Sequence, residues 1–303
     1  MKKILFLGCN TNQIPYLHII KEQGYYVVGA DLNPNAPGKP LCNTFYPVAY
    51  DNIAGLEDII QNESFAHSDR IFSAAAQFAQ VSAAHLAENL KIDYPSKALI
   101  ETCLDKRAYY DLFKQHNLPI PKTVSVGNPE ELKAALGNNQ DAQSFYVKSD
   151  YSKNPHYVYK LSPGDSIDHV NWQQDRYFRE CYLVQPEFIG RHIRINLAKN
   201  FCSYFPFMEK DSFEACFESI QNSSAVTDLR KFLNAVRLSG WMVKFDVVIN
   251  ETGEYVVLDI GFDPPSRMVK QYKDKDLNFP KYYVQQYLDK RVEYPELENV
   301  IYE

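Results

Sequence analysis

The sequence lacks any long hydrophobic run, and its six cysteines include no C-x-x-C pair. A membrane-spanning helix needs roughly 18 or more consecutive apolar residues, so the sequence predicts none. The apolar start, Ile4–Leu7, is interrupted by the polar residues Asn10–Gln13, and no small-residue cleavage site follows. Scattered cysteines suit a reducing compartment better than a disulfide framework or a zinc site. We therefore expect a cytoplasmic protein that does not span a membrane.

A strong charge of one sign is also missing, since the formal net charge is −6 over 303 residues. This balance argues against a broad surface for nucleic acid or membranes, although it is compatible with a local basic cleft. The hydrophobic share of 45% and the charged share of 23% are ordinary for a globular protein. The length predicts two or three packed lobes.

Glycine is scarce where a dinucleotide fingerprint would need it. The first residues predict a strand over 3–8, a helix over 13–23 and a strand over 26–30 that ends at Asp31, the opening of a Rossmann-like α/β unit. The loop Gly8–Gln13 has one glycine, whereas the G-x-G-x-x-G fingerprint of NAD or FAD sites has three. Residues 1 to about 100 are therefore predicted to form a parallel-sheet domain without such a site.

Two lysines stand near the ends of predicted elements in the middle of the chain. A helix over 104–117 carries the pair Asp105-Lys106, and it stops before Pro119 because proline cannot continue a helix. A strand over 144–148 ends at Lys148. From this strand alone, Lys148 is equally well interpreted as a solvated strand end.

The segment 192–198 alternates strictly between apolar and polar side chains. In a strand, Ile193, Ile195 and Leu197 would face one side, and His192, Arg194 and Asn196 the other. If the polar face lines a cleft, it offers an imidazole, a guanidinium and an amide to a phosphate or a carboxylate. If that face meets water, the same pattern describes an ordinary half-exposed strand.

The segment Phe245–Asp263 predicts two strands joined by a turn around Gly253. Asp246 lies near the start of the first strand and Asp259 ends the second. Because the start of one antiparallel strand lies beside the end of the next, we expect the two carboxylates to come together. Mg²⁺ is usually held by one or two carboxylates together with substrate phosphates. A surface hairpin with scattered acids is the alternative.

Taken in order, these features resemble the ATP-grasp superfamily over nearly the whole chain. After the Rossmann-like start come a helix with Asp105–Lys106 and the proline turn Leu118–Pro121, and then the strand lysine Lys148. A hinge, Val184–Gly190, and the acidic hairpin with Asp246 and Asp259 follow. The segment Gln185–Arg194 looks most like the branch of ribosomal-protein glutamate ligases and other amino-acid ligases. The resemblance implies an α/β and α+β fold, in which a Rossmann-like pre-ATP-grasp domain (1–103) precedes a two-lobed ATP-grasp domain (N-lobe 104–184, C-lobe 185–303).

The resemblance implies a nucleotide site built from several parts of the chain. The residues that would contact the phosphates or form the hinge against adenine are Lys106, Lys148, Glu187, Phe188 and Ile189. The family's usual ribose-binding acid is replaced near His192, which we expect to take part in nucleotide binding. The loop after the strand lysine lacks the family's usual glycines, and Lys153 and His156 would supply side-chain contacts instead.

The resemblance also implies catalytic residues and a metal. Arg194 would hold the transferred phosphate or an acyl-phosphate, and Arg267 would help to hold the acceptor substrate or phosphate. The side chains that would bind Mg²⁺, with Mn²⁺ as an alternative, are Asp246, Asp259 and, as compensation, Asp263. The family usually has Glu at the second metal position and Asn two residues later, but this chain has Gly261 at the latter place. One metal or two remain compatible with the sequence.

The function implied by the resemblance is an ATP- and Mg²⁺-dependent ligase. It would activate a small carboxylic acid, such as an amino acid, as an acyl-phosphate for attack by an amine. A kinase on the same scaffold and a non-catalytic nucleotide- or metabolite-binding protein are the alternatives. The expected partners are small molecules, not nucleic acid or membranes, and a homodimer is compatible with the sequence. Acceptor selectivity is expected from three regions, which are Gly8–Gln13, Ala74–Ala79 and Met208–Asn222.

Overall fold

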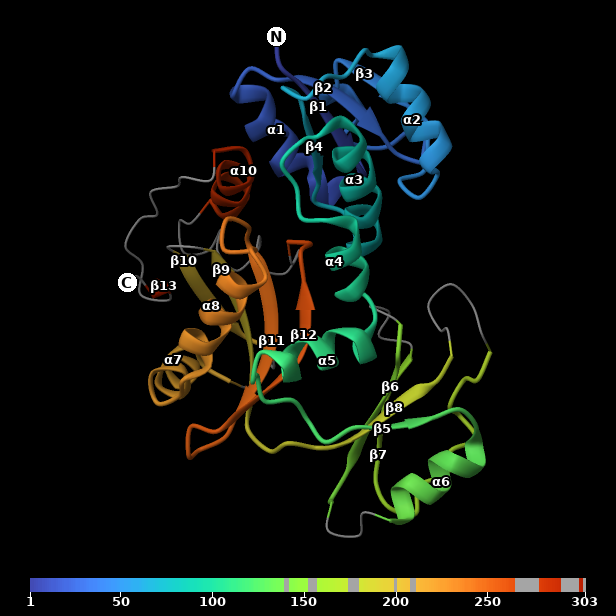
Figure 1. Cartoon of the computed structure of the whole chain (residues 1–303), viewed down its shortest axis with the longest axis vertical. Coiled ribbons are helices and arrows are strands. Elements are labelled where there is room, and N and C mark those ends of the chain that lie inside the picture. The colour runs from blue at the N-terminus through green and yellow to red at the C-terminus, as the bar shows by residue number, and fades with distance from the viewer. Residues whose placement is uncertain are drawn as a thin grey trace.

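In the part of this protein that the structure describes, the strands form three sheets that follow one another along the chain (Figure 1). The computed structural model describes residues 1–138, 142–151, 157–173, 180–198, 201–207, 211–264, 278–289 and 300–301. Within these ranges, no helix is both long enough and apolar enough to cross a membrane.

The first sheet has four parallel strands in the order β3-β2-β1-β4. Its elements, with the helices beside them, are β1 (Lys3–Leu7), η1 (Thr11–Gln13), α1 (Ile14–Glu22), β2 (Tyr26–Ala30), η2 (Lys39–Leu41), β3 (Thr44–Tyr46), α2 (Ile53–Asn62), β4 (Arg70–Ser73) and α3 (Gln77–Leu90). The strand order reverses between β1 and β4. Open α/β sheets bind ligands at such a switch point, outside the carboxyl ends of the strands.

The loops that follow β1 and β4 meet at this switch point. Gly8 adopts φ +85°, and a Cβ at Gly8 would lie only 2.6 Å from the Cβ of Ala75. Glycine is therefore required at position 8 for both its backbone conformation and the close approach of the two loops. The single glycine of the Gly8–Gln13 loop thus serves loop packing.

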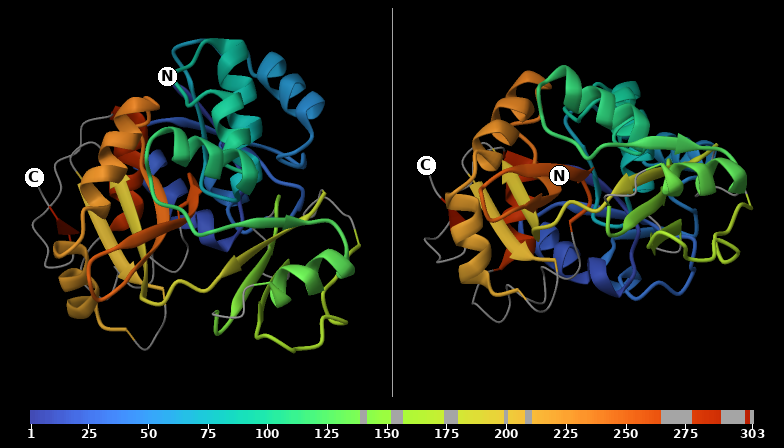
Figure 2. Two further views of the ribbon diagram at one scale, coloured as in Figure 1. Left: turned by 60° about the horizontal axis from the view of Figure 1, so that its bottom comes forward. Right: turned by 90° about the horizontal axis from the view of Figure 1, so that it is seen from below.

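Two helices lead from the first sheet to the second, α4 (Lys97–Thr102) and α5 (Lys106–Gln115). Asp105 caps α5 by accepting hydrogen bonds from the backbone N–H groups of Arg107 and Ala108, at 2.9 and 3.2 Å. The second sheet is antiparallel in the order β5-β8-β6-β7 and projects to one side of the molecule (Figure 2). Its elements are β5 (Val124–Val126), α6 (Pro129–Gly137), β6 (Phe145–Ser149), β7 (Val158–Leu161) and β8 (Tyr182–Pro186).

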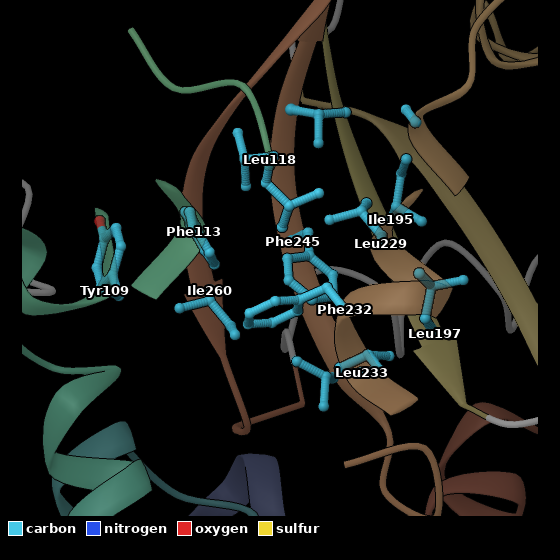
Figure 3. Packing of buried hydrophobic residues seen from close by; sticks show 14 of the residues in the cluster. Tyr109, Phe113, Leu118, Ile195, Leu197, Leu229, Phe232, Leu233, Phe245 and Ile260 are labelled. Carbon is cyan, nitrogen blue, oxygen red and sulfur yellow. The ribbon is translucent and has the colours of Figure 1, made fainter. Parts of the chain in front are cut away.

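The third sheet is antiparallel in the order β12-β11-β9-β10-β13. Its elements and helices are β9 (Arg191–Ala198), β10 (Phe201–Pro206), α7 (Phe213–Gln221), α8 (Ala225–Ala235), β11 (Val243–Ile249), β12 (Tyr255–Gly261) and β13 (Val300–Ile301). Figure 3 shows its core, where Phe232 of α8 lies between Phe113 of α5 and Phe245 of β11, with ring centroids 5.3 and 6.1 Å apart. Helix α5 is thereby fixed against this sheet. The sequence pattern does not predict β10 and α7.

A C-terminal helix, α10 (Phe279–Asp289), returns to the first sheet. Its Tyr283 and Tyr287 pack edge-on against Phe72 of β4, at centroid distances of 5.8 and 5.0 Å. The Tyr283 hydroxyl also donates a hydrogen bond to the carbonyl of Phe262, just after β12, at 2.6 Å. This helix therefore joins the first sheet to the end of the acidic hairpin, and it holds the two sides of the site described next.

Candidate functional site

Three charged side chains form one row across neighbouring strands of the third sheet. In the strand register, Arg194 of β9 is opposite Asp246 of β11, and Asp246 is opposite Asp259 of β12. The expected approach of the two carboxylates is confirmed. The apolar residues Ile193 and Ile195 are fully buried in the core cluster, as the alternation predicts for the other face of β9.

Arg194 and Asp246 form a bidentate ion pair within this row. The Nε and Nη2 groups of Arg194 donate to the two carboxylate oxygens of Asp246 at 2.5 and 2.7 Å. Burial by itself would raise the pKa of Asp246, but the charge and hydrogen bonds of Arg194 outweigh it and hold that pKa below its usual value. Asp246 is therefore ionised at neutral pH, and the guanidinium is held rigidly beside it.

Asp259 is positioned by helix α5. The hydroxyl of Tyr109 lies 3.1 Å from Asp259 Oδ1 and 3.1 Å from the carbonyl of Leu258. The neighbouring Tyr110 also donates to the Leu258 carbonyl, at 3.0 Å. Both tyrosines are buried. The helix that carries Lys106 therefore also orients the carboxylate at the end of the hairpin.

A second ion pair lies one step further along the hairpin. Lys244 Nζ donates to Asp263 Oδ2 at 2.7 Å, and both side chains are largely buried. A Cβ at Gly261 would lie 2.4 Å from Cε of Lys244. The space that a side chain at position 261 would need is therefore occupied by Lys244. This contact gives a physical reason for the glycine at position 261.

We expect Gly261→Ala to destabilise the protein by about 1–3 kcal/mol, because the added methyl group overpacks against Lys244. In a Lys244→Ala background the same substitution should cost much less, since the residue it contacts has been shortened. Urea unfolding of the two single variants and the double variant measures this difference. Equal costs in both backgrounds would show that Lys244 does not fill the space above Gly261.

His192 lies on β9 near the same charged row. Its ring stacks on Phe207 at a centroid distance of 4.0 Å. Burial, and after it the positive charges of Lys148 and Arg194, lower the pKa of His192 to about 4, although nearby Asp246 raises it. The imidazole is therefore neutral at physiological pH. Its Nε2 is buried without a hydrogen-bond partner among the described residues.

The predicted hinge residues lie at the end of β8 and in the loop that follows. The Glu187 carboxylate accepts hydrogen bonds from Ser144 and from Lys160, the latter at 2.7 Å. Burial would raise the pKa of Glu187, but Lys160 and Ser144 lower it overall. Phe188 is half-buried, whereas the side chain of Ile189 is 69% exposed. The Glu187 side chain thus connects the end of β8 to β7 and to the residue before β6. Contact between adenine and the segment Glu187–Ile189 stays a prediction.

The two predicted phosphate-binding lysines stand on different elements. Lys148 lies on β6, with its Nζ 5.6 Å from the ring centroid of Tyr146. Lys106 is buried at the start of α5, and its backbone N–H donates to the carbonyl of Asp150 at 2.7 Å. That hydrogen bond brings the start of α5 to the end of the strand that carries Lys148. Arg267, Lys153 and His156 lie outside the described residues.

The carboxylates suit Mg²⁺ only if phosphates complete its coordination. Among the described residues, no group of three or more His, Cys, Asp or Glu side chains is arranged to hold a metal ion. Asp246 and Asp259 are adjacent, and two carboxylates together with nucleotide phosphates are a usual Mg²⁺ ligand set. The donor chemistry therefore fits the ion. The assignment of Asp263 as a third ligand stays a prediction.

A cavity of about 260 Å³ opens between the first sheet and the charged row. It is lined by the loop after β1, helix α1, the start of the loop after β4, two residues of the third sheet and the segment after β12: Asn10, Asn12, Gln13, Tyr16, Ala74, Ala75, Arg194, Lys244, Asp263 and Pro264. Two of the regions expected to set acceptor selectivity contribute to it. The described residues 211–222 of the third region do not. Tyr16 and Lys244 are not predicted from the sequence, although the switch point between β1 and β4 is a signal that leads to Tyr16.

The comparisons with known proteins identify the fold. No protein-family model matches the sequence, and no curated protein matches it. Many solved structures match. N5-carboxyaminoimidazole ribonucleotide synthetase from Thermotoga maritima superposes with a TM-score of 0.71 at 14% identity, covering 98% of this chain and 78% of that one. L-amino acid ligase from Bacillus licheniformis gives 0.67 at 14% identity, covering 95% and 74%.

A third match is the biotin carboxylase domain of 2-oxoglutarate carboxylase from Hydrogenobacter thermophilus, a dimer in complex with MgADP and bicarbonate. Its TM-score is 0.72 at 13% identity, covering 99% of this chain and 72% of that one. At these identities the likeness concerns the fold, and it extends over nearly the entire chain. The fold predicted from the sequence is confirmed.

Proposed function

We propose, from the premise that this chain has the ATP-grasp fold, that it is an ATP- and Mg²⁺-dependent ligase. Its substrates would be a small carboxylic acid and an amine. The observation that carries this proposal is the row of Arg194, Asp246 and Asp259 beside a polar cavity. Synthetases and an amino-acid ligase are among the solved structures with the same fold.

The residues divide into a nucleotide part and an acceptor part. Lys106 and Lys148 would contact the nucleotide phosphates, and the segment Glu187–Ile189 would lie against adenine. Asp246 and Asp259 would hold Mg²⁺, which when bound supplies charge neutralisation at the phosphates. His192, which is neutral, would add hydrogen bonding rather than charge.

The proposed reaction has two steps. A carboxylate oxygen of the acid attacks the γ-phosphorus of ATP, so that an acyl-phosphate forms and ADP leaves. The amine then attacks the acyl carbon, an amide bond forms, phosphate leaves and the amine loses its proton. Negative charge accumulates around the transferred phosphoryl group, and the rigid guanidinium of Arg194 would offset it in both steps. Arg267 keeps its predicted role at the acceptor or phosphate.

Two measurements test this proposal. Calorimetric titration with ATP, with and without Mg²⁺, should show Mg²⁺-dependent binding. A screen of acids and amines should then show ADP release that requires both substrates. A stable phosphorylated product formed without an amine would favour the kinase alternative. Absence of ATP binding under both conditions would leave only a non-catalytic function.

The proposal extends to the partners, the cellular compartment and the domains of the protein. Its partners would be small molecules, and it would work in the cytoplasm, where the six cysteines, which are all free, would remain reduced. The proposal is compatible with a homodimer. The division into a substrate domain (1–103), an N-lobe (104–184) and a C-lobe (185–303) belongs to this proposal.

Lys148→Met is expected to weaken ATP binding by about tenfold to a hundredfold, because it removes a positive charge proposed to contact the phosphates. Lys133→Met is the matched control, since Lys133 is exposed on α6 of the same lobe. Calorimetry with ATP and Mg²⁺ measures both variants. If both lysine variants bind ATP like the original protein, Lys148 has no place in the nucleotide site.

A further inference from the structure

Two cysteines of the first domain meet over strand β2. Cys9 follows Gly8 in the loop after β1, and Cys42 directly follows η2. A Cβ at Gly29 of β2 would lie 2.4 Å from Sγ of Cys42 and 3.2 Å from Sγ of Cys9. The two sulfur atoms therefore border the same methyl-sized space, and glycine at position 29 leaves room for both. The proposed function uses neither thiol.

The backbone around the two cysteines is fixed by hydrogen bonds. The N–H of Gly38 donates to the carbonyl of Cys9 at 2.8 Å, and the N–H of Cys9 donates to Asp31 Oδ2 at 2.6 Å. The N–H of Cys42 donates to the carbonyl of Lys39 at 3.0 Å, which closes the turn of η2. A bond between the two sulfur atoms would therefore join segments that already contact each other, as disulfide geometry requires.

The two thiols differ in exposure and in acidity. Cys9 is fully buried, whereas Cys42 is partly exposed. A hydrogen bond to Cys42, and then burial, raise the pKa of Cys9. The hydrogen bond from Cys9, together with the positive charge of Lys21, lowers the pKa of Cys42, although burial opposes this. Since the thiolate is the nucleophile in disulfide exchange, Cys42 is the sulfur that can attack an oxidant, and Cys9 is placed to resolve the product.

We propose that Cys9 and Cys42 form a reversible disulfide when the protein meets a small disulfide such as oxidised glutathione. The Cys42 thiolate attacks one glutathione sulfur, the S–S bond of glutathione breaks, and one glutathione thiolate leaves. Cys9 loses its proton and attacks the Cys42 sulfur, and the second glutathione thiolate leaves. Two cysteine thiols lose two electrons, and oxidised glutathione gains them and the two protons. This inference does not rest on the proposed ligase function.

The disulfide would act on the loop that lines the polar cavity. Asn10, Asn12 and Gln13 follow Cys9 and belong to the cavity lining. The hydrogen bond from Gly38 already anchors the start of this loop, and the disulfide adds a covalent anchor at the same residue. Intracellular disulfides are usually transient, so a reducing compartment would return the pair to thiols. Oxidation would therefore restrain the cavity loop reversibly.

The first experiment identifies the bond in the original protein. The full chain is incubated with excess oxidised glutathione, the remaining thiols are alkylated, and a non-reducing digest is analysed by mass spectrometry. We expect linked peptides that contain Cys9 and Cys42, and we expect dithiothreitol to separate them. A stable glutathione adduct on Cys42, alkylated thiols at both positions, or a bond from either residue to a third cysteine would overturn the proposal.

Three variants test the order of the two steps. Cys9→Ala removes the resolving thiol, so it should accumulate at least tenfold more glutathione adduct on Cys42 than the original protein. Cys42→Ala should leave the buried Cys9 unmodified. Cys216→Ala is the matched control, because it removes a buried thiol from α7, beside β10 of the third sheet, and should leave the bond intact. An adduct on Cys9 in Cys42→Ala, or none on Cys42 in Cys9→Ala, would contradict the assigned roles.

Amide hydrogen exchange tests the effect on the cavity loop. In the oxidised original protein, the amides of residues 10–13 should exchange at least threefold more slowly than in the reduced protein, because the bond restrains the residue before them. Cys42→Ala, treated in the same way, should show no difference. Equal exchange in the oxidised and reduced forms of the original protein would overturn the proposed restraint of the loop.

Discussion

Asp259→Asn is expected to lower ATP-dependent turnover by about a hundredfold to a thousandfold while the fold is retained. Asparagine has nearly the same shape, and its side-chain oxygen can still accept the hydrogen bond from Tyr109 that is 3.1 Å long in the original protein. The change removes only the negative charge that would bind Mg²⁺. The rate of ADP release and the midpoint of thermal unfolding measure the two effects separately.

The matched control for this prediction is Glu251→Gln, at the exposed turn of the same hairpin. It removes the same charge from the same hairpin, at the end remote from Asp259, so turnover should not change. A Mg²⁺ titration at fixed ATP should show a higher half-saturating concentration for Asp259→Asn only. Turnover at the original level in Asp259→Asn would exclude this carboxylate from the metal site.

The parts of this fold that are local in sequence are the parts that the sequence predicts well. The hairpin that carries Asp246 and Asp259 needs only two apolar runs and a turn, and the pairing of the two acids follows from antiparallel geometry. Strand β9 alternates in sequence over 192–197, and Ile193, Ile195 and Leu197 enter one core cluster, although Asn196 on the other face is buried too. In contrast, all six residues of β10, Phe201–Pro206, are buried, so no alternation marks this strand.

The residues of the site that the sequence does not predict depend on contacts between distant segments. Lys244 stands directly before the acidic hairpin, but its place is defined by the space that Gly261 leaves open. Tyr16 follows the loop after β1, and it becomes part of a site only because α10 brings the end of β12 toward the first sheet. No periodicity in the sequence records either contact. Whether a buried polar atom such as His192 Nε2 has a hydrogen-bond partner can likewise be judged only when its neighbours in the folded chain are known.

Arg194→Met is expected to lower the free energy of unfolding by about 3–5 kcal/mol at neutral pH. The substitution keeps much of the side-chain volume but leaves the Asp246 carboxylate buried without its cation. Turnover should also be lost, because the proposed phosphate-binding guanidinium is gone. Urea unfolding in the presence of a chelator measures the stability of the metal-free protein, and ADP release measures the activity.

The double variant Arg194→Met/Asp246→Leu separates these two losses. A buried ion pair replaced on both sides by apolar groups is often neutral for stability, so the double variant should recover most of the lost free energy of unfolding. It should remain inactive, since both proposed functions of the pair are absent. Recovery of stability together with activity would contradict the proposed roles of Arg194 and Asp246.

The pH dependence of the single variant gives an independent measure of the same pair. In the original protein the pKa of Asp246 is held below its usual value. The pair's contribution to stability is therefore fully present above about pH 4, the pKa of the unfolded state. It is lost as the pH falls through the lower pKa of the folded state. Without Arg194, burial raises the pKa of Asp246, and stability lost at neutral pH returns as the carboxyl group becomes protonated. The difference in unfolding free energy between Arg194→Met and the original protein should therefore shrink as pH falls from 7. A difference that stays constant over this range would mean that Asp246 is hydrated in the variant, and that the ion pair serves to position Arg194 rather than to neutralise a buried charge.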